Sequence, residues 1–294
     1  MTFALASEIC IPYRKSLCFL RKNRTLLSMK KQAKVRRHFA PCAELKNGSV
    51  VAIGNFDGVH KGHQSVLKAA KALAAQENLP VVMMTFEPHP RRVLTPNAPG
   101  RITPFADKVR LASRNDVDIV SAVRFTKPYA GTSAETFMKE HLGEHLNAKH
   151  VVVGDDFAFG RGREGSAEAM QRASTSYGFT THIVPAVKDM QGVEMASTLI
   201  REALESGDLN HAKNLLGYAP TLKLRFCEGV ASLSRYTPIK NGEYLTRLLY
   251  SEGFHDNVEL MRVVIKDGEL AVLDFPPIDD AMPIVTLELL EKMN

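Results

Sequence analysis

Short apolar runs alternate with amphipathic stretches along residues 49 to 217. The runs are brief, rich in Val and Ile, and bounded by polar residues, which is typical of strands buried on both faces of a parallel sheet. We predict strands at residues 50–54, 81–86, 119–125, 151–154 and 180–184. Helical spacing between the runs predicts helices at residues 63–76, 104–114, 132–142 and 166–177. This alternation predicts an α/β domain that covers residues 46–217.

Two of these helices have further local support. In the first, Val66, Ala70 and Leu73 fall on one face. The second begins at Pro104 directly after Thr103, a pair that favours an N-cap followed by proline in the first turn. Both helices are therefore expected to pack an apolar stripe on the sheet.

The pattern changes after Tyr218. Apolar runs at residues 221–231, 244–251, 258–266 and 270–275 are separated by turn residues such as Asn241-Gly242 and Asp267-Gly268, which is typical of hairpins in an antiparallel sheet. We predict a small β-rich domain at residues 218–294 that ends in a helix at residues 285–293.

The positive charge of the chain is concentrated at its start. The net charge is +6, yet residues 1–40 hold ten Lys or Arg against the single acid Glu8, so the remaining 254 residues carry a net −3. Such a segment is compatible with nucleic-acid binding, a membrane surface or an organelle address. Because Met29 offers a second plausible start, we instead expect residues 1–45 to be a disordered or over-extended basic leader. No nucleic-acid or membrane partner is expected.

Composition excludes several classes of protein. No apolar run approaches the ~20 residues that a membrane-spanning helix needs. The four cysteines, at positions 10, 18, 42 and 227, show no C-x-x-C spacing, which argues against a zinc site or a disulfide scaffold. We expect a globular protein of a reducing compartment, the cytoplasm.

The segment with the most chemical information is residues 53–63, I-G-N-F-D-G-V-H-K-G-H, between the first strand and its helix. Ligands of parallel sheets gather at the carboxyl ends of the strands, where a helix N-terminus offers N–H groups to a phosphate. Three glycines allow a close approach of the backbone, and His60 and His63 lie three residues apart. Two imidazole donors can stabilise a triphosphate as pyrophosphate departs. A metal site is the alternative, but no third His or Cys lies nearby.

This segment resembles the H-x-G-H signature of the nucleotidyltransferase superfamily, whose catalytic domain is Rossmann-like. The longer form G-N-F-D-G-V-H is similar to that of bacterial FAD synthetases, the adenylyltransferase half of bifunctional riboflavin kinase/FAD synthetases. Further family motifs follow in order: T-F-E-P-H-P at 85–90, R-I-T at 101–103 with Lys108, V-G-D-D-F-A-F-G at 153–160 and S-T-L-I-R at 197–201. The resemblance covers residues 49–217 and implies transfer of AMP from ATP to FMN.

The resemblance implies roles for particular residues. The expected catalytic residues are His60, His63 and Arg201. The expected ATP site adds Gly54, Asn55, Phe56, Gly62, Ser197 and Thr198 to these three. The expected FMN site comprises Phe86, Pro88, His89, Pro90, Asp155, Asp156, Phe157 and Phe159, with Arg161 and Arg163 as further cations for a phosphate. No protein side chain is expected to bind a metal, and Mg²⁺ is expected on the ATP phosphates.

The chemistry of these residues suits the implied roles, although each segment also has a plain structural explanation. Phe157 and Phe159 can pack on a ring system or belong to the core. Ser197 can cap a helix predicted at residues 200–204, and the forked guanidinium of Arg201 suits a triphosphate. Ala196 stands where the family usually has a Ser, which is expected to weaken ATP binding.

The implied reaction is an in-line displacement, in which a phosphate oxygen of the acceptor attacks the α-phosphorus of ATP. Such reactions depend mainly on positioning and electrostatics. Because a phosphate acceptor is ionised at neutral pH, neither a base nor a covalent intermediate is required.

Residues 218–294 lack the G-F-P-T-A-N element of the family's riboflavin kinase barrel. We therefore expect a degenerate barrel without riboflavin kinase activity. The alternatives are a bifunctional enzyme, a nucleotidyltransferase for another acceptor such as phosphopantetheine, and a protein that binds flavin or ATP without catalysis. The aromatic motifs favour flavin, and the two histidines favour catalysis.

Overall fold

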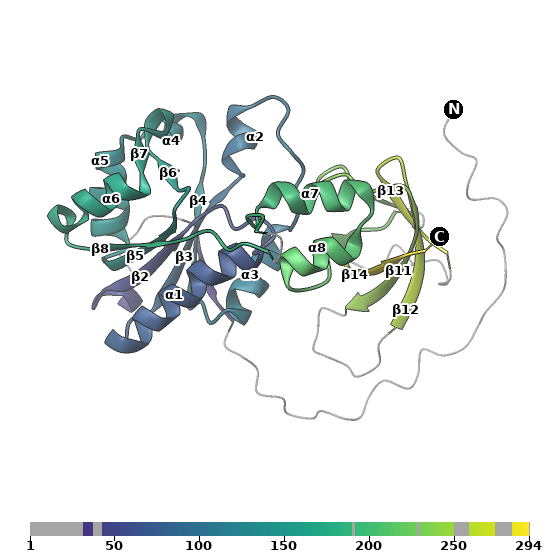
Figure 1. Cartoon of the computed structure of the whole chain (residues 1–294), viewed down its shortest axis with the longest axis horizontal. Coiled ribbons are helices and arrows are strands. Elements are labelled where there is room, and N and C mark those ends of the chain that lie inside the picture. Colours follow the sequence, from purple (N-terminus) through teal and green to yellow (C-terminus); the bar gives the residue numbers. More distant parts are fainter. Residues whose placement is uncertain are drawn as a thin grey trace.

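Two six-stranded sheets of different character make up most of the described protein in the computed structural model (Figure 1), and a small third sheet pairs Ala158–Phe159 (β6) with Gly165–Ser166 (β7). The structure describes residues 32–37, 43–189, 192–227, 230–249, 259–273 and 284–293. The first sheet is parallel and flanked by helices, and the second is antiparallel. The predicted α/β class with a following β-rich part is confirmed. None of the helices in the described ranges is both long and apolar enough to cross a membrane.

Six parallel strands form the first sheet, in the order β1-β4-β3-β2-β5-β8. Their bounds are Lys34–Arg36 (β1), Ser49–Ile53 (β2), Val81–Glu87 (β3), Ile119–Arg124 (β4), Ala148–Gly154 (β5) and Thr180–Val184 (β8). β2 is hydrogen-bonded to β3 on one side and to β5 on the other. The loops that follow these three strands therefore meet at the carboxyl edge of the sheet, where parallel sheets bind ligands.

Helices connect the strands of the parallel sheet, and two further helices follow its last strand and lead to the second sheet. They are α1 (Lys61–Glu77), α2 (Pro90–Leu94), α3 (Phe105–Arg114), α4 (Lys127–Ala130), α5 (Ala134–Thr136), α6 (Ala167–Ala173), α7 (Ser197–Ser206) and α8 (Leu209–Leu216). The helix predicted at residues 132–142 is instead α5 followed by a π-helix at Phe137–His145. The spacing of apolar residues could not distinguish an α-helix from a π-helix, because both bury the same side of so short a segment.

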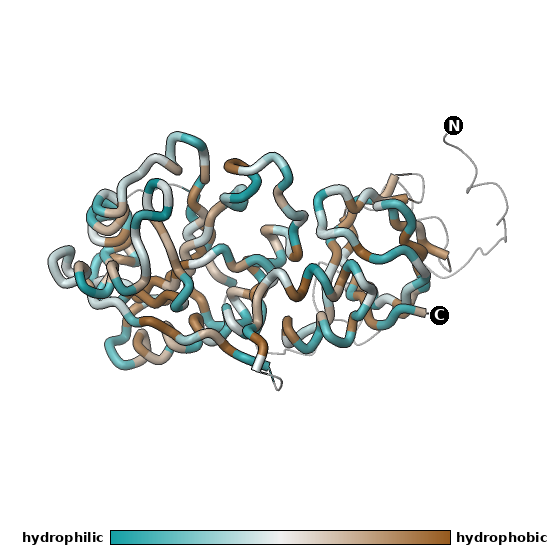
Figure 2. The backbone as a smooth tube through the Cα atoms, turned by 45° about the horizontal axis from the view of Figure 1, so that its top comes forward, coloured by the Kyte–Doolittle hydropathy of each residue, from teal (hydrophilic) through white to brown (hydrophobic). Residues whose placement is uncertain are grey.

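Apolar side chains fill both faces of the parallel sheet. Val51 and Val82 lie in a cluster on one face, Val50 and Met83 lie in a cluster on the other, and all four are fully buried. Figure 2 shows these central strands as the brown interior of the α/β part. Each such side chain contributes roughly 1.5–3 kcal/mol by leaving water. Alternation between two apolar faces explains why the strands read as continuous hydrophobic runs.

Two sequence predictions at the edges of this part are wrong. Lys34–Arg36 falls within the predicted leader but forms β1, which pairs with β4. A strand of three residues, two of them charged, shows no alternation of apolar and polar positions, so the sequence does not predict it. Of the rest of the leader, residues 1–31 and 38–42 lie outside the described residues, and Ala43–Leu45 form a short 3₁₀ helix. Thr103 does not cap α3, whose N-cap is Pro104 without a side-chain hydrogen bond.

The second sheet is antiparallel, in the order β10-β13-β12-β11-β14-β9. Its strands are β9 (Thr221–Leu224), β10 (Val230–Ser232), β11 (Gly242–Leu249), β12 (Glu259–Lys266), β13 (Glu269–Val272) and β14 (Val285–Lys292). The predicted closing helix is wrong, since β14 occupies it. Val285, Leu287 and Leu289 are buried at a spacing of two. Pairing with β11 and β9 overrides the helical propensity of the Leu and Glu residues.

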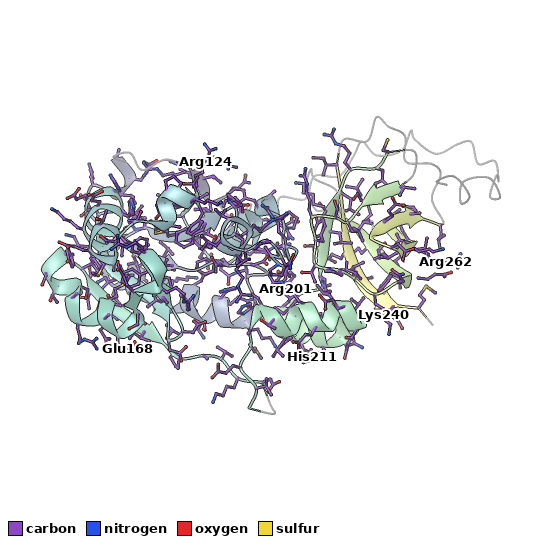
Figure 3. The ribbon with its side chains drawn as sticks, turned by 90° about the horizontal axis from the view of Figure 1, so that it is seen from above. Arg124, Glu168, Arg201, His211, Lys240 and Arg262 are labelled. Carbon is purple, nitrogen blue, oxygen red and sulfur yellow. The ribbon has the colours of Figure 1, made fainter. Side chains whose placement is uncertain are left out.

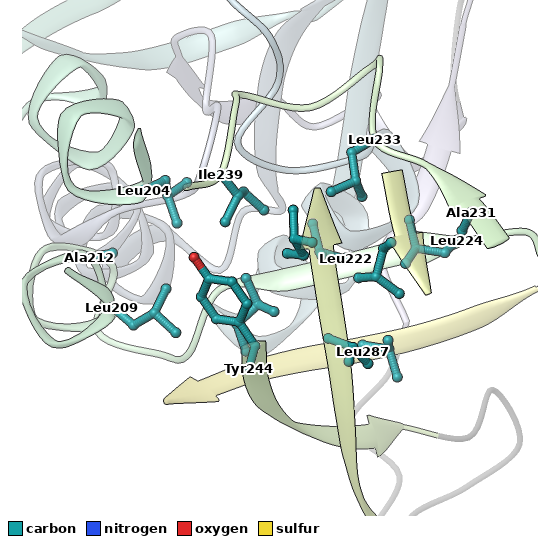
Figure 4. Packing of buried hydrophobic residues seen from close by; sticks show 14 of the residues in the cluster. Leu204, Leu209, Ala212, Leu222, Leu224, Ala231, Leu233, Ile239, Tyr244 and Leu287 are labelled. Carbon is teal, nitrogen blue, oxygen red and sulfur yellow. The ribbon is translucent and has the colours of Figure 1, made fainter. Parts of the chain in front are cut away.

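Helices α7 and α8 lie between the two sheets (Figure 1) and share a core with the second one. Leu204 and Ala212 on the helices pack in one cluster with Tyr244 and Leu287 on the strands (Figure 4). Tyr244 is fully buried, and its hydroxyl donates to the Lys240 carbonyl. The helix that carries Arg201 is therefore anchored on the second sheet.

Candidate active site

The loop after β2 brings the two predicted catalytic histidines together. His60 is the N-cap of α1, and its Nδ1 accepts a hydrogen bond from the His63 N–H at 3.4 Å. The two imidazoles stack with their ring centroids 3.8 Å apart. A side chain on Gly62 would place its Cβ 3.1 Å from the His60 ring and 3.2 Å from the Met195 carbonyl oxygen. Glycine therefore allows this close packing beside the helix N-terminus without displacing either neighbour.

Both histidines are neutral at pH 7. Burial lowers the pKa of His60 to about 4, although the charge of Asp57 opposes this shift. Burial also lowers the pKa of His63 well below its ordinary value, and His60 and Lys108 add to the effect. Because His60 Nδ1 accepts a hydrogen bond, its proton is on Nε2, which is free to donate. The buried Nδ1 of His63 has no hydrogen-bond partner among the described residues.

Backbone strain accompanies this loop. Phe56 and Val59 have φ angles of 49° and 38°, a region that non-glycine residues rarely adopt. Each such residue costs of order 1–3 kcal/mol and persists only where its surroundings enforce it. Both side chains are fully buried, and the Phe56 ring lies 5.1 Å from that of His63. Phe56 thus packs against His63. Because its side chain is buried, the predicted contact of Phe56 with ATP could involve only its backbone.

Asp57 joins the histidine loop to Arg201. The Arg201 Nη2 lies 2.6 Å from Asp57 Oδ2, and both side chains are largely buried. The carboxylate also accepts hydrogen bonds from the backbone N–H groups of Ile102 and Thr103 at 3.1 Å. Burial lowers the pKa of Arg201, but the adjacent Asp57 charge opposes the shift, so the guanidinium stays charged. Arg201 therefore has a fixed position beside the two histidines.

Lys108 lies beneath the histidine loop. Its side chain is almost fully buried, and Nζ donates to the Asn55 carbonyl at 2.9 Å and to Thr85 Oγ1 at 3.3 Å. Nζ is also 4.0 Å from Glu87 Oε2, and Glu87 forms an ion pair with Arg101. Burial lowers the pKa of Lys108, and the charges of Asp57 and Glu87 oppose that change. Lys108 thus ties the loop to β3.

A small pocket opens beside these groups. It is lined by four basic side chains, by two carboxylates and by His89, among others: Arg92, Arg101, Lys108, Arg201, Asp57 and Glu87. Four cations against two anions favour a negatively charged ligand. A larger hollow of about 530 Å³ lies where β5 begins, lined in part by Asn147 and Lys149, and it contains none of the predicted site residues. The small pocket has a volume of only about 10 Å³, room for one water molecule, so its charge and not its size makes it the better candidate for phosphate binding.

The N-terminus of α7 approaches the same loop. Ser197 and Thr198 are its first two residues rather than its preceding cap, which corrects the predicted helix start by three residues. Ser197 Oγ donates to the Asp57 carbonyl at 3.2 Å, and Thr198 is exposed. Ala196 is the N-cap and makes no side-chain hydrogen bond. The missing hydroxyl at this position therefore removes a helix cap.

Replacing Ala196 by Ser should stabilise the protein. The N-cap backbone is extended, with φ −122° and ψ 155°, so a Ser hydroxyl can accept from a free N–H of the first turn. We expect the free energy of unfolding to rise by about 1 kcal/mol, measured by urea denaturation. Ala173, whose backbone is already helical, is the matched control site, and Ala173→Ser should give no increase. Equal effects at both positions would contradict the cap.

The predicted flavin residues after β3 lie beside the pocket. His89 is the N-cap of α2, and its Nδ1 accepts from the Arg91 N–H at 3.2 Å. Burial lowers the pKa of His89 to about 4, and the charges of Asp57, Lys108 and Arg201 also act on it. Phe86 is partly exposed and packs with the rings of Phe125 and Tyr129. Pro88 and Pro90 flank His89 and fix the start of α2.

The predicted flavin residues after β5 divide into ligand candidates and supports. Phe157 and Phe159 stack with centroids 5.6 Å apart, but Phe159 is buried in the core and Phe157 is only partly buried. Asp155 accepts from the Ala186 N–H at 3.0 Å, and Asp156 is exposed. Phe159 therefore supports Phe157, which remains the better candidate for a flavin contact. Arg161 and Arg163 are exposed in a short 3₁₀ turn.

Sequence reasoning gave no role to Asp57 or Glu87. Both belong to quoted motifs, and an acid inside a glycine-rich loop that binds phosphate was an available signal. The structure shows that the two carboxylates hold Arg201, Arg101 and Lys108 in place. Their partners lie more than ten residues away along the chain, so spacing alone could not pair them.

The shifted pKa of His60 predicts a pH dependence of stability. Between its ordinary value of 6.5 and about 4, the unfolded chain binds a proton that the folded protein does not. The free energy of unfolding should therefore fall as pH falls through this window, and His60 alone contributes about 3 kcal/mol. Urea denaturation near the two ends of the window tests this for the unmodified protein and for His60→Asn. The variant should show the smaller difference, and an equal difference would refute the assignment.

Comparison with known proteins shows which family the chain resembles. The FAD synthetase family model matches residues 42–199. The bifunctional riboflavin kinase/FMN adenylyltransferase of Escherichia coli strain K12 is 39% identical over 185 residues, which are 63% of this chain and 59% of that protein. The protein of the same name from Buchnera aphidicola subsp. Schizaphis graminum is 30% identical over 218 residues, or 70% of each chain. The matched part thus spans about three fifths of the E. coli relative.

A solved structure resembles both parts of the fold. It is described as a macrolide-efflux protein from Streptococcus pneumoniae, with a TM-score of 0.70 and 27% sequence identity. The match covers 84% of this chain and 86% of that one, and so extends beyond the α/β part. The family match, which spans more than half of the chain, includes the histidine loop, the Phe86 to Pro90 segment and the start of α7. The chain therefore belongs to the FAD synthetase family.

Proposed function

We propose that this protein is a nucleotidyltransferase that transfers AMP from ATP to FMN and releases FAD and pyrophosphate. The observation that carries the proposal is the stacked pair of His60 and His63 at the N-terminus of α1, next to the charged guanidinium of Arg201. Arg201 also lines the small pocket, in which cations outnumber anions. Such an arrangement suits a triphosphate more than it suits a neutral ligand.

The proposed roles follow from the position of each group. The Nε2–H of His60 and the N-terminal N–H groups of α1 donate to the phosphates of ATP. His63 is the second imidazole at this position, and its buried Nδ1 has no hydrogen-bond partner among the described residues. Arg201 and Lys108 add fixed positive charge as negative charge builds on the leaving pyrophosphate.

The acceptor enters from the loops after β3 and β5. Phe86 lies on β3 and Phe157 lies in the loop after β5, and these are the two strands that flank β2. Both aromatic side chains are partly exposed and suit a planar flavin ring. The FMN phosphate would then point toward the α-phosphorus above the histidine loop. Its oxygen attacks in line while pyrophosphate leaves on the opposite side. The ionised phosphate needs no protein base.

Magnesium is proposed to enter as the complex with ATP. Among the described residues, no group of three or more His, Cys, Asp or Glu side chains could hold a metal ion. The ion would neutralise phosphate charge, whereas the protein residues bind and orient the nucleotide.

We assign the transfer reaction to residues 46–217 and expect little or no riboflavin kinase activity from residues 218–294. The second part carries the predicted antiparallel sheet but not the G-F-P-T-A-N element. Ready formation of FMN from riboflavin and ATP would overturn this part of the proposal.

Incubation of the protein with FMN, ATP and magnesium, followed by chromatography for FAD, tests the function. FAD above the level of a protein-free control is the expected result. Replacing FMN by phosphopantetheine or by nicotinamide mononucleotide should give no product. Product from one of these acceptors instead of FMN would keep the reaction class and change the substrate. Binding of FMN without any product would favour a protein that holds flavin without catalysis.

A further inference from the structure

A short segment, residues 100–103, lies between the candidate active site and the second sheet. The Gly100 carbonyl accepts two hydrogen bonds, one from Arg201 Nε at 3.3 Å and one from Thr237 Oγ1 at 3.1 Å. Arg201 belongs to the active site, and Thr237 belongs to the chain between β10 and β11. Figure 3 shows Arg201 near the place where the two parts of the protein meet. The Gly100 carbonyl thus connects Arg201 in the active site to Thr237 beside the second sheet.

The connection between β10 and β11 of the second sheet holds this segment tightly. The Thr237 N–H donates to the Arg101 carbonyl at 2.8 Å, and the Arg101 N–H donates to the Arg235 carbonyl at 3.1 Å. A Cβ on Gly100 would lie only 2.0 Å from the Tyr236 carbonyl oxygen, so the two backbones are in direct contact. Thr237 is 1% exposed. Solvent therefore cannot replace its hydrogen bond to Gly100 without local opening.

The other side of the segment contacts the histidine loop. Ile102 and Thr103 donate their backbone N–H groups to Asp57, the ion-pair partner of Arg201. The Ile102 side chain is buried in the core that α7, α8 and the second sheet share. Arg101 forms the ion pair with Glu87 beside Lys108. A shift of residues 100–103 would therefore displace Arg201 and the groups around it.

We infer that the second sheet is a positioning element for adenylyl transfer, and that Thr237 acts through the Gly100 carbonyl to orient Arg201. The inference rests on the proposed function and adds a residue from outside the α/β part. Thr237 touches no substrate, so it is a positioning residue. In-line transfer depends on the placement of charged groups to within a fraction of an ångström. This gives the second sheet a role in the reaction that needs no kinase activity.

Thr237→Val tests the inference because it keeps the shape of the side chain and removes the hydroxyl. We expect kcat for FAD formation to fall about 5- to 10-fold, the effect of one neutral hydrogen bond on the transition state. Thr237→Ser, which restores the hydroxyl, should recover most of the rate. Thr246→Val is the matched control, because Thr246 is fully buried in β11 and its Oγ1 donates to the Met261 carbonyl at 3.0 Å. It should lower Tm by a similar amount but keep kcat.

A double-mutant cycle with Arg201→Ala separates positioning from general destabilisation. If Thr237 acts through Arg201, Thr237→Val should change kcat less than 2-fold in the Arg201→Ala background. An unchanged kcat in the single variant, or a full 5- to 10-fold effect in both backgrounds, would overturn the inference while leaving the proposed function intact. Absence of FAD formation by the unmodified protein would instead refute the proposed function and, with it, this inference.

Discussion

Replacing His60 by Asn should lower the rate of FAD formation about 100- to 1,000-fold, which is the usual effect of removing one donor that stabilises transition-state charge. Asn can still cap α1, so the variant removes the imidazole and keeps the helix start. The neutral imidazole is buried and stacked on His63. Steady-state assays with FMN and MgATP measure the effect.

His211→Asn is the matched control for this experiment. His211 lies exposed on α8, where Figure 3 shows it on the helix, and it belongs neither to the pocket nor to the loop. Its replacement should leave the rate within 2-fold of the unmodified protein. A His60→Asn variant that retains more than a tenth of the activity would exclude His60 as a catalytic residue.

Replacing Asp57 by Ala should lower the free energy of unfolding by about 3–5 kcal/mol, the usual cost of leaving one member of a buried ion pair alone. The change strands the Arg201 guanidinium and also leaves the N–H groups of Ile102 and Thr103 without their acceptor. Urea denaturation measures the loss, and activity should fall together with it, because Arg201 and the histidine loop lose their common partner.

An exposed ion pair provides the comparison for Asp57. Arg247 and Glu288 lie 3.3 Å apart on the second sheet, but the Arg247 side chain is 42% exposed. Glu288→Ala should therefore cost less than about 1 kcal/mol. Similar losses from Asp57→Ala and Glu288→Ala would contradict a special role for the buried pair. The double variant Asp57→Ala/Arg201→Met should recover part of the stability, because it no longer buries the Arg201 charge without a partner.

The sequence contained most of the α/β part in readable form. Strands such as Ser49–Ile53 and Val81–Glu87 are buried on both faces, so their composition alone marks them. The position of the histidine loop followed from parallel-sheet topology, and the structure places both imidazoles in one stack. These features depend on local sequence and on general rules of chain topology.

The features that the sequence did not reveal depend on contacts between distant residues. The helix predicted at residues 285–293 is strand β14, because pairing with β11 and β9 outweighs the helical propensity of its Leu and Glu residues. Asp57 is hydrogen-bonded to Arg201, which is 144 residues away along the chain, and Gly100 is hydrogen-bonded to Thr237, which is 137 residues away. No pattern within a short window can report such pairs.

The most direct test of the central claim follows the α-phosphate of ATP. ATP labelled at the α-phosphate is incubated with the protein, FMN and magnesium, and FAD and pyrophosphate are quantified together. The account predicts labelled FAD and unlabelled pyrophosphate in equal amounts, and loss of both in His60→Asn. Label found in free AMP or ADP without FAD, or product formation that is unaffected by the change at His60, would contradict it.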